Sequence, residues 1–148
     1  MKTIFDRPSR ESLIRRIHTL TENNKAQWGK MTVSQMVQHC MRFEEMVQVK
    51  RNCKRSLLGR VIGQWALKGF MKQQLLQRNM PTSPELVIKK ARCISNDQDK
   101  LQWVALLEEY DRFDNHPFIH PFFGKMTKEQ IGILAYKHTD HHLRQFNS

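Results

Sequence analysis

The chain lacks the features that mark secreted and membrane-spanning proteins. Its three cysteines, Cys40, Cys53 and Cys93, are odd in number and include no C-x-x-C pair, which argues against a disulfide framework and a zinc ribbon. The N-terminal sequence MKTIFDRPSRESL has no apolar stretch typical of a signal peptide, and no run of about 18 uncharged apolar residues occurs. We therefore expect a soluble cytoplasmic protein with reduced thiols.

Acidic residues are scarce, and one long stretch has none. The 148 residues include 25 Lys and Arg against 14 Asp and Glu, which gives a formal net charge of +11. Between Glu45 and Glu85 the sequence has no acidic residue but eight basic ones: Lys50, Arg51, Lys54, Arg55, Arg60, Lys68, Lys72 and Arg78. The excess positive charge is therefore largely local. It is compatible with binding to nucleic acid or anionic lipid, although it does not identify a partner.

The pattern that is present is helical. Apolar residues recur at helical spacing over residues 9–22, 32–51, 95–113 and 127–146, and no segment alternates convincingly like a strand. TVSQ at 32–35 and SNDQ at 95–98 are capping boxes, and TKEQ at 127–130 opens the last helix.

Residues 56–78 are amphipathic but are interrupted by Gly59, Gly63 and Gly69, so they predict one or two short helices. A chain of this length is the size of one domain, 1–148. The sequence predicts an all-α fold, an up-down four-helix bundle with a short helical insertion between the second and third main helices.

Three histidines lie within KHTDHHLRQF, residues 137–146. At about 100° per residue, His138 and His142 continue the apolar line of the last helix, whereas His141 turns aside. His39 stands between Met36 and Phe43 and also faces inward. Two histidines four residues apart have Cβ atoms about 5 to 6 Å apart, so both rings can reach one ion.

Those positions predict a metal site formed by His138 and His142, with His39 as the third ligand. The alternative is that each inward histidine is a hydrogen-bonded core residue, which is the commoner role of a single such residue. His116 and His120 precede prolines, which disfavours helix, so we expect them in loop turns.

Four other polar residues have simpler expected roles. His18 lies at the edge of the apolar stripe of the first helix, and Cys40 is expected in the core. Asp140 is expected to pair with Arg144, four residues later on the helix surface. Gln145, three residues after His142, either orients that ring or is an ordinary surface residue.

The runs WGKMTVSQMVQHC, HPFFGKMTKEQ and KHTDHHLRQF resemble the DinB-like superfamily, and within it a subfamily of uncharacterised function. The resemblance implies a four-helix bundle in which His39, His138 and His142 bind a divalent ion, typically zinc or nickel. It further implies activation of a low-molecular-weight thiol, such as bacillithiol or mycothiol, for transfer or isomerisation, and often a homodimer. Many relatives have Arg-Gly-Gln after the paired histidines, whereas this chain has Leu143, Arg144 and Gln145.

Three hypotheses of function follow. The first is a metal-dependent transferase, in which the basic segment 50–78, placed like an insertion, covers the metal or forms a pocket for an acidic substrate. The second is a metal-containing binding or structural protein without catalysis. The third is a basic module that binds nucleic acid or an anionic membrane through the acid-free segment with Trp65 and Phe70.

Overall fold

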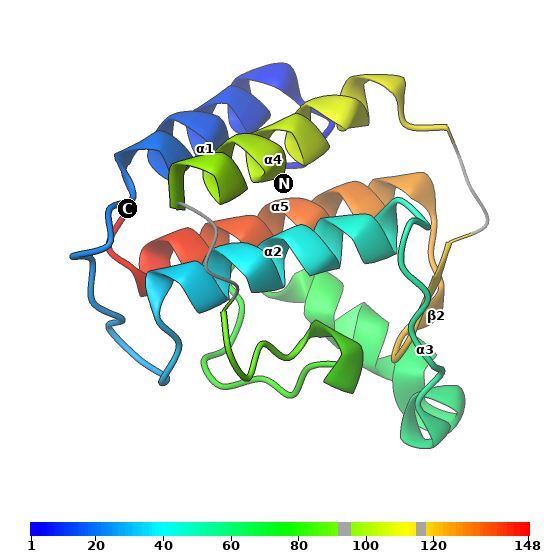
Figure 1. Ribbon diagram of the computed structural model, residues 1–148. Coiled ribbons are helices and arrows are strands. Elements are labelled where there is room, and N and C mark those ends of the chain that lie inside the picture. Colours follow the sequence, from blue (N-terminus) through cyan, green and yellow to red (C-terminus); the bar gives the residue numbers. More distant parts are fainter. Residues whose placement is uncertain (92–95, 115–117) are drawn as a thin grey trace.

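The computed structural model describes residues 1–91, 96–114 and 118–148, and it is mostly helical (Figure 1). The predicted all-α fold agrees with this architecture. The elements are α1 (Arg7–Thr19), α2 (Val33–Val47), α3 (Leu57–Lys72), the 3-10 helix η1 (Pro84–Leu86), α4 (Asn96–Glu108), the 3-10 helix η2 (Glu109–Arg112), β1 (Ile119–His120), β2 (Gly124–Lys125) and α5 (Lys128–Gln145). Within the described ranges, no helix is long and apolar enough to cross a membrane.

Both helices that carry the inward histidines begin at a capping box. The Thr32 side chain accepts a hydrogen bond from the backbone N–H of Gln35, whose side chain in turn accepts one from the Thr32 N–H. Thr127 and Gln130 repeat this arrangement at the start of α5. Because each box satisfies two otherwise unpaired donors, both helix starts are fixed, and so are the histidine positions counted from them.

Several helix ends differ from the predicted ones. Helix α1 begins before residue 9 because Asp6 is its N-cap and accepts from the Ser9 N–H. Helix α2 ends at Val47 and not near residue 51, since Val49 adopts a positive φ of 60°. Residues 56–78 contain a single helix, α3, which spans Leu57–Lys72. The predicted loop before α5 also contains a pair of two-residue antiparallel strands, β1 and β2.

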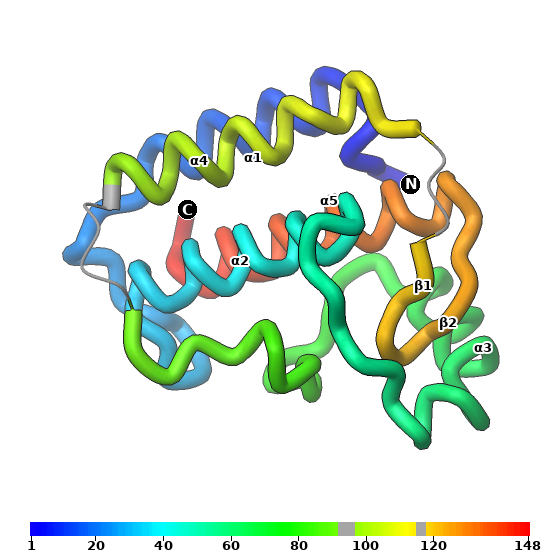
Figure 2. Tube along the Cα trace, turned by 45° about the vertical axis from the view of Figure 1, so that its right-hand side comes forward, coloured from blue at the N-terminus to red at the C-terminus, as the bar shows by residue number. Residues whose placement is uncertain are grey.

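The helices share one hydrophobic core, to which Leu67 and Phe70 of α3 also contribute. Helix α4 contacts α1 and α2, and α5 contacts the same two helices from the other side. Figure 1 shows α1 and α4 side by side above α2 and α5, with α3 beneath them. Turned by 45°, Figure 2 again shows α3 beside the two short strands, away from α1 and α4.

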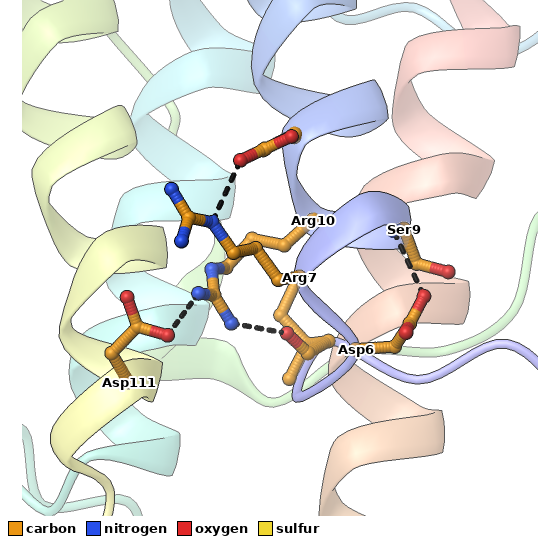
Figure 3. A network of polar contacts seen from close by, with 7 residues as sticks. Asp6, Arg7, Ser9, Arg10 and Asp111 are labelled. Carbon is orange, nitrogen blue, oxygen red and sulfur yellow. Dashed lines mark hydrogen bonds and ion pairs between the residues drawn. The ribbon is translucent and has the colours of Figure 1, made fainter.

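A polar network fastens the start of α1 to η2 (Figure 3). The buried guanidinium of Arg10 donates to the Ile4 carbonyl at 3.0 Å and pairs with Asp111. Arg7 pairs with Glu11 one turn later on the exposed side of α1. A guanidinium has several donors in a fixed plane, so Arg10 can bridge two elements distant in sequence.

Helix α3 rests on the β1–β2 hairpin through its glycines. A Cβ on Gly59 would lie 2.4 Å from the Phe122 carbonyl oxygen, and one on Gly63 would lie 2.1 Å from it. These glycines therefore allow a helix–backbone approach that no larger residue permits. At the far end of α3, the buried ammonium of Lys137 donates to the carbonyls of Phe70, at 3.0 Å, and Gln73. Such a bond from a lysine satisfies the last carbonyls of a helix.

Three expectations fall outside the described ranges. The reduced state of Cys93, the capping box at Ser95 and the loop position of His116 concern residues 92–95 and 115–117.

The glycine contacts predict opposite effects for two alanine substitutions in α3. Gly63→Ala should lower the free energy of unfolding by about 1 to 3 kcal/mol, because its Cβ overlaps the Phe122 backbone. Gly69 has no neighbouring atom within 4 Å, so Gly69→Ala should raise stability by about 0.5 to 1 kcal/mol. Urea unfolding of the two variants measures both changes. Equal effects would contradict the close contact between α3 and the hairpin.

Candidate metal centre

His39 lies on α2 with one ring nitrogen already engaged. The side chain is 5% exposed, and its Nδ1 lies 2.9 Å from the Leu86 carbonyl oxygen of η1. Because a carbonyl can only accept, Nδ1 carries the proton and donates. The lone pair is therefore on Nε2, the nitrogen that faces α5.

His142 is held in the same tautomer by an amide. Its Nδ1 lies 2.9 Å from Oε1 of Gln145, whose Nε2 donates to the Trp28 carbonyl at 2.7 Å. The bond to Trp28 identifies the nitrogen end of the amide, so Oε1 accepts from His142 Nδ1–H. The lone pair of His142 is consequently on Nε2. Of the two roles considered for Gln145, the structure favours that of orienting His142.

His138 lies one turn before His142 and is positioned by stacking. Its ring is nearly parallel to that of Phe43 on α2, with centroids 3.7 Å apart and an interplanar angle of 11°. Its Nδ1 is buried without a hydrogen-bond partner among the described residues. The residue keeps some solvent exposure, unlike the buried His39 and His142.

The three rings converge between α2 and α5. Nε2 of His39 lies 3.1 Å from Nε2 of His138, and one nitrogen from each of the three rings lies within 4.8 Å of the others. Two nitrogens bound to one zinc ion at about 2.0 to 2.1 Å are roughly 3.3 Å apart. The Nε2 atoms of His39 and His138, 3.1 Å apart, already have about this separation. The nitrogens that are farthest apart, up to 4.8 Å, would reach it if their rings rotated toward the centre of the cluster. The cluster could therefore hold a metal ion.

A proton cannot satisfy the cluster as well as a cation can. One proton between Nε2 of His39 and Nε2 of His138 engages the lone pair of only one of these two nitrogens. Nδ1 of His138 has no partner among the described residues with either a proton or an ion at Nε2. A divalent ion, by contrast, accepts a lone pair from each of the three rings. The donor set therefore fits a borderline-soft divalent metal.

Burial keeps the three imidazoles neutral. It lowers the pKa of His142 to about 3, with a further contribution from His39. Burial also lowers the pKa of His138 well below its ordinary value, and repulsion from His142 adds to the effect. The pKa of His39 is lowered by burial, while its bond to Leu86 acts in the opposite direction. Neutral imidazole is the form that binds metal.

The other histidines are placed elsewhere. His141 turns away from the cluster, as its helical position predicts, but it is buried with its ring edge-on to Trp28 at 5.3 Å. His120 lies in the β1–β2 hairpin, where its Nδ1 accepts from the backbone N–H groups of Phe122 and Phe123, both at 3.1 Å. Burial lowers the pKa of His120 to about 4. His18 is exposed.

Two further expectations can be compared with the structure. Cys40 is a buried core residue whose thiol contacts Met36. Asp140 pairs with Arg144 at 2.8 Å, as predicted, and also with Arg16 of α1 at 2.7 Å. The carboxylate therefore joins two helices, in addition to pairing along the surface of its own helix.

Sequence reasoning missed a buried carboxyl group on α2, the helix that carries His39. Glu44 is 0% exposed; it accepts from the Tyr110 hydroxyl at 2.5 Å and from the Thr139 hydroxyl at 3.3 Å. Burial raises its pKa to about 8, while both hydroxyls act in the opposite direction. The signal was available, because Glu44 lies four residues after Cys40 and three before Val47, on the apolar line of α2.

A pH dependence of stability follows from Glu44. The unfolded chain loses this proton near the ordinary pKa of 4.5, whereas the native protein keeps it up to about pH 8. From pH about 6.5 to 8 the native state keeps the Glu44 proton that the unfolded chain has lost, so Glu44 alone lowers the free energy of unfolding by about 2 kcal/mol over this range. The buried histidines act in the opposite direction, because they are neutral in the native state and partly protonated in the unfolded chain near pH 6.5. The stability of Glu44→Gln relative to wild type should therefore rise by about 2 kcal/mol from pH 6.5 to 8. Denaturant unfolding with chelator present tests the prediction, and a constant difference between the two proteins would contradict it.

The comparisons with known proteins identify the family but no characterised relative. No curated protein and no solved structure matches the chain significantly. A family model described as "Protein of unknown function (DUF1569)" matches residues 5–148, which is nearly the whole chain. The chain therefore belongs to the DUF1569 family of proteins of unknown function.

Proposed function

We propose that the protein binds one divalent metal ion, zinc or nickel, through His39, His138 and His142. The observation that carries the proposal is the convergence of three neutral imidazoles, with the second nitrogen of two rings fixed by oxygen acceptors. We further propose that residues 1–148 form a single up-down four-helix bundle of the DinB-like type. The pairwise packing of α1, α2, α4 and α5 supports this part of the proposal.

The proposed activity is a metal-dependent transfer reaction of a low-molecular-weight thiol. Three neutral ligands leave the charge of a divalent ion intact, so a thiol or water that approaches it would lose its proton near neutral pH. In this chain, the Leu86 carbonyl and Gln145 hold His39 and His142 with Nε2 toward the ion, and Phe43 fixes the plane of His138. The partial exposure of His138 supports access of a small molecule from that side.

The segment after α3 runs beside the part of α5 that carries His141, next in sequence to the ligand His142. Lys137 binds the end of α3, Leu76 contacts His141 through its backbone, and Arg78 lies over the Trp28 ring at 4.4 Å. The end of the basic segment thus follows the C-terminal half of α5. Arg78 would place a positive charge where an acidic substrate could reach it.

A metal-containing protein without catalysis is the second candidate. It is favoured by burial, since His39 is 5% and His142 is 8% exposed. In this case chelation should lower the thermal midpoint, because an ion that binds only the native state stabilises it, and no turnover should occur. Assays with a small thiol and an electrophile distinguish the two candidates.

Metal content tests the ligand set directly. Purified wild-type protein should hold about one zinc or nickel ion per chain, and His39→Ala, His138→Ala or His142→Ala should remove most of it. His141→Ala is the matched control, since it changes a buried histidine of the same helix outside the cluster. Elemental analysis gives the readout. Equal metal content in all five proteins would refute the site, and retained metal without turnover would leave only the second candidate.

The role of Gln145 gives a separate prediction. Gln145→Ala removes the acceptor that fixes the His142 tautomer, and metal affinity should fall by about 10-fold to 100-fold. Gln74→Ala, at an exposed glutamine on the segment after α3, should leave the affinity unchanged. Competition with a chromogenic chelator measures both constants. Equal affinities in the two variants would show that Gln145 does not orient the ligand.

A further inference from the structure

Helix α3 presents an apolar stripe to solvent. Val61 is 84% and Trp65 is 77% exposed, and Leu57 and Leu58 are exposed as well. Leu57, Val61 and Trp65 follow one another at intervals of four residues, so they lie along one side of the helix. Clustered exposed apolar side chains of this size usually mark an interaction surface.

The exposure of this stripe is enforced by the opposite face of α3. Gly59 and Gly63 lie against the Phe122 backbone, and Leu67 and Phe70 are buried. Rotating the helix to bury Val61 and Trp65 would break these contacts and push side chains into the hairpin. Figures 1 and 2 both show α3 at the outside of the molecule. The stripe is therefore available to something other than the rest of this chain.

The charges around the stripe are all of one sign. Arg60, Lys68 and Lys72 are exposed on the same helix, and none is in an ion pair among the residues that the structure describes. Lys68 and Lys72 come three and seven residues after Trp65, which places them on the same side as the stripe. Residues 46–84 contain no acidic side chain. The complementary surface must therefore be negatively charged.

We propose that the outer face of α3 docks on an anionic phospholipid surface. An amphipathic helix with lysines and arginines beside tryptophan and aliphatic residues lies in the plane of the bilayer interface. Trp65 would sit at the headgroup level, where indole rings are favoured, with Leu57 and Val61 in the acyl boundary. Lys68 and Lys72 would contact the lipid phosphates.

Two other partners fit the surface less well. Nucleic acid offers negative charge but no apolar layer for Leu57, Leu58 and Val61, since its recognition relies on polar, charged and stacking contacts. A second copy of the chain, paired through the same face, would bring together two faces whose exposed charged residues, Arg60, Lys68 and Lys72, are all basic. Like charges at such an interface are unfavourable. The bilayer satisfies both the apolar and the charged part of the surface.

Vesicle binding tests the proposal on the full chain. Vesicles of phosphatidylcholine with about 30% phosphatidylserine should sediment the protein, whereas phosphatidylcholine alone should not. The anionic vesicles should also shift the summed emission of the three tryptophans to shorter wavelength, because Trp65 is the exposed one that would leave water. The double variant Lys68→Glu with Lys72→Glu should weaken binding at least about tenfold. Val61→Ser should weaken it too, because it removes a buried apolar contact.

Matched controls separate this face from the net charge of the protein. Arg15→Glu with Lys25→Glu makes the same change in charge on exposed residues of α1 and the loop after it, and Leu101→Ser removes an exposed leucine from α4. Both should bind vesicles like the wild type. Equal losses of vesicle binding in both charge variants would refute the proposal, and so would no binding of the wild type to the anionic vesicles. It would also be refuted if changing Lys68, Lys72 or Val61 abolished nucleic-acid binding or dimerisation and left vesicle binding as it was. Metal content of the purified variants should be unchanged throughout, so a failure of this proposal can be told apart from a failure of the histidine site.

Discussion

Polar groups buried in a core need partners, and in this protein that requirement determines the position of α5. Four polar residues of this helix, three of them buried and Asp140 half-buried, bond to four different parts of the chain. Lys137 bonds to the end of α3, Thr139 to Glu44 of α2, Arg16 of α1 pairs with Asp140, and Gln145 holds both His142 and the Trp28 carbonyl. Each bond is directional, so together they leave α5 one rotation about its axis. The histidine cluster depends on that rotation.

The cluster combines two opposing demands. A metal ligand needs a free lone pair, but a buried lone pair without a partner is unfavourable. For His39 and His142 an acceptor at Nδ1 keeps the lone pair on Nε2, and for His138 stacking on Phe43 fixes the plane of the ring. Without these contacts the three rings would be held less firmly, and the other ring nitrogen could turn toward the cluster.

The residues needed to predict the candidate site were close together or regularly spaced in the sequence. His138 and His142 could be found from their four-residue spacing, and Thr32 and Thr127 from local capping chemistry. The Leu86 carbonyl could not be predicted as the partner of His39, because 47 residues separate them and a short 3-10 helix supplies the acceptor. The same holds for Tyr110, which reaches Glu44 from 66 residues away.

The sequence shows that residues 56–78 are amphipathic, but it does not show which face of the helix packs against the rest of the protein. An amphipathic pattern ordinarily places its leucines in the core, and here Leu57 and Leu58 are outside. The buried face is the one with the glycines, because only glycine fits against the Phe122 backbone carbonyl. That carbonyl belongs to the hairpin, so the sequence of the helix alone could not indicate which face is buried. Gly59 and Gly63 have a low helix propensity, yet they are the residues through which α3 packs on the β1–β2 hairpin.

Lys137 has one more consequence, which arises from its place in the chain. It binds the last carbonyls of α3, and the next residue is His138. The residue that binds the end of the helix with the exposed stripe and the residue whose ring completes the cluster are therefore neighbours in sequence on α5. If an ion and a surface partner each favour a particular position of α3, their affinities are linked, and each must change the other by the same factor.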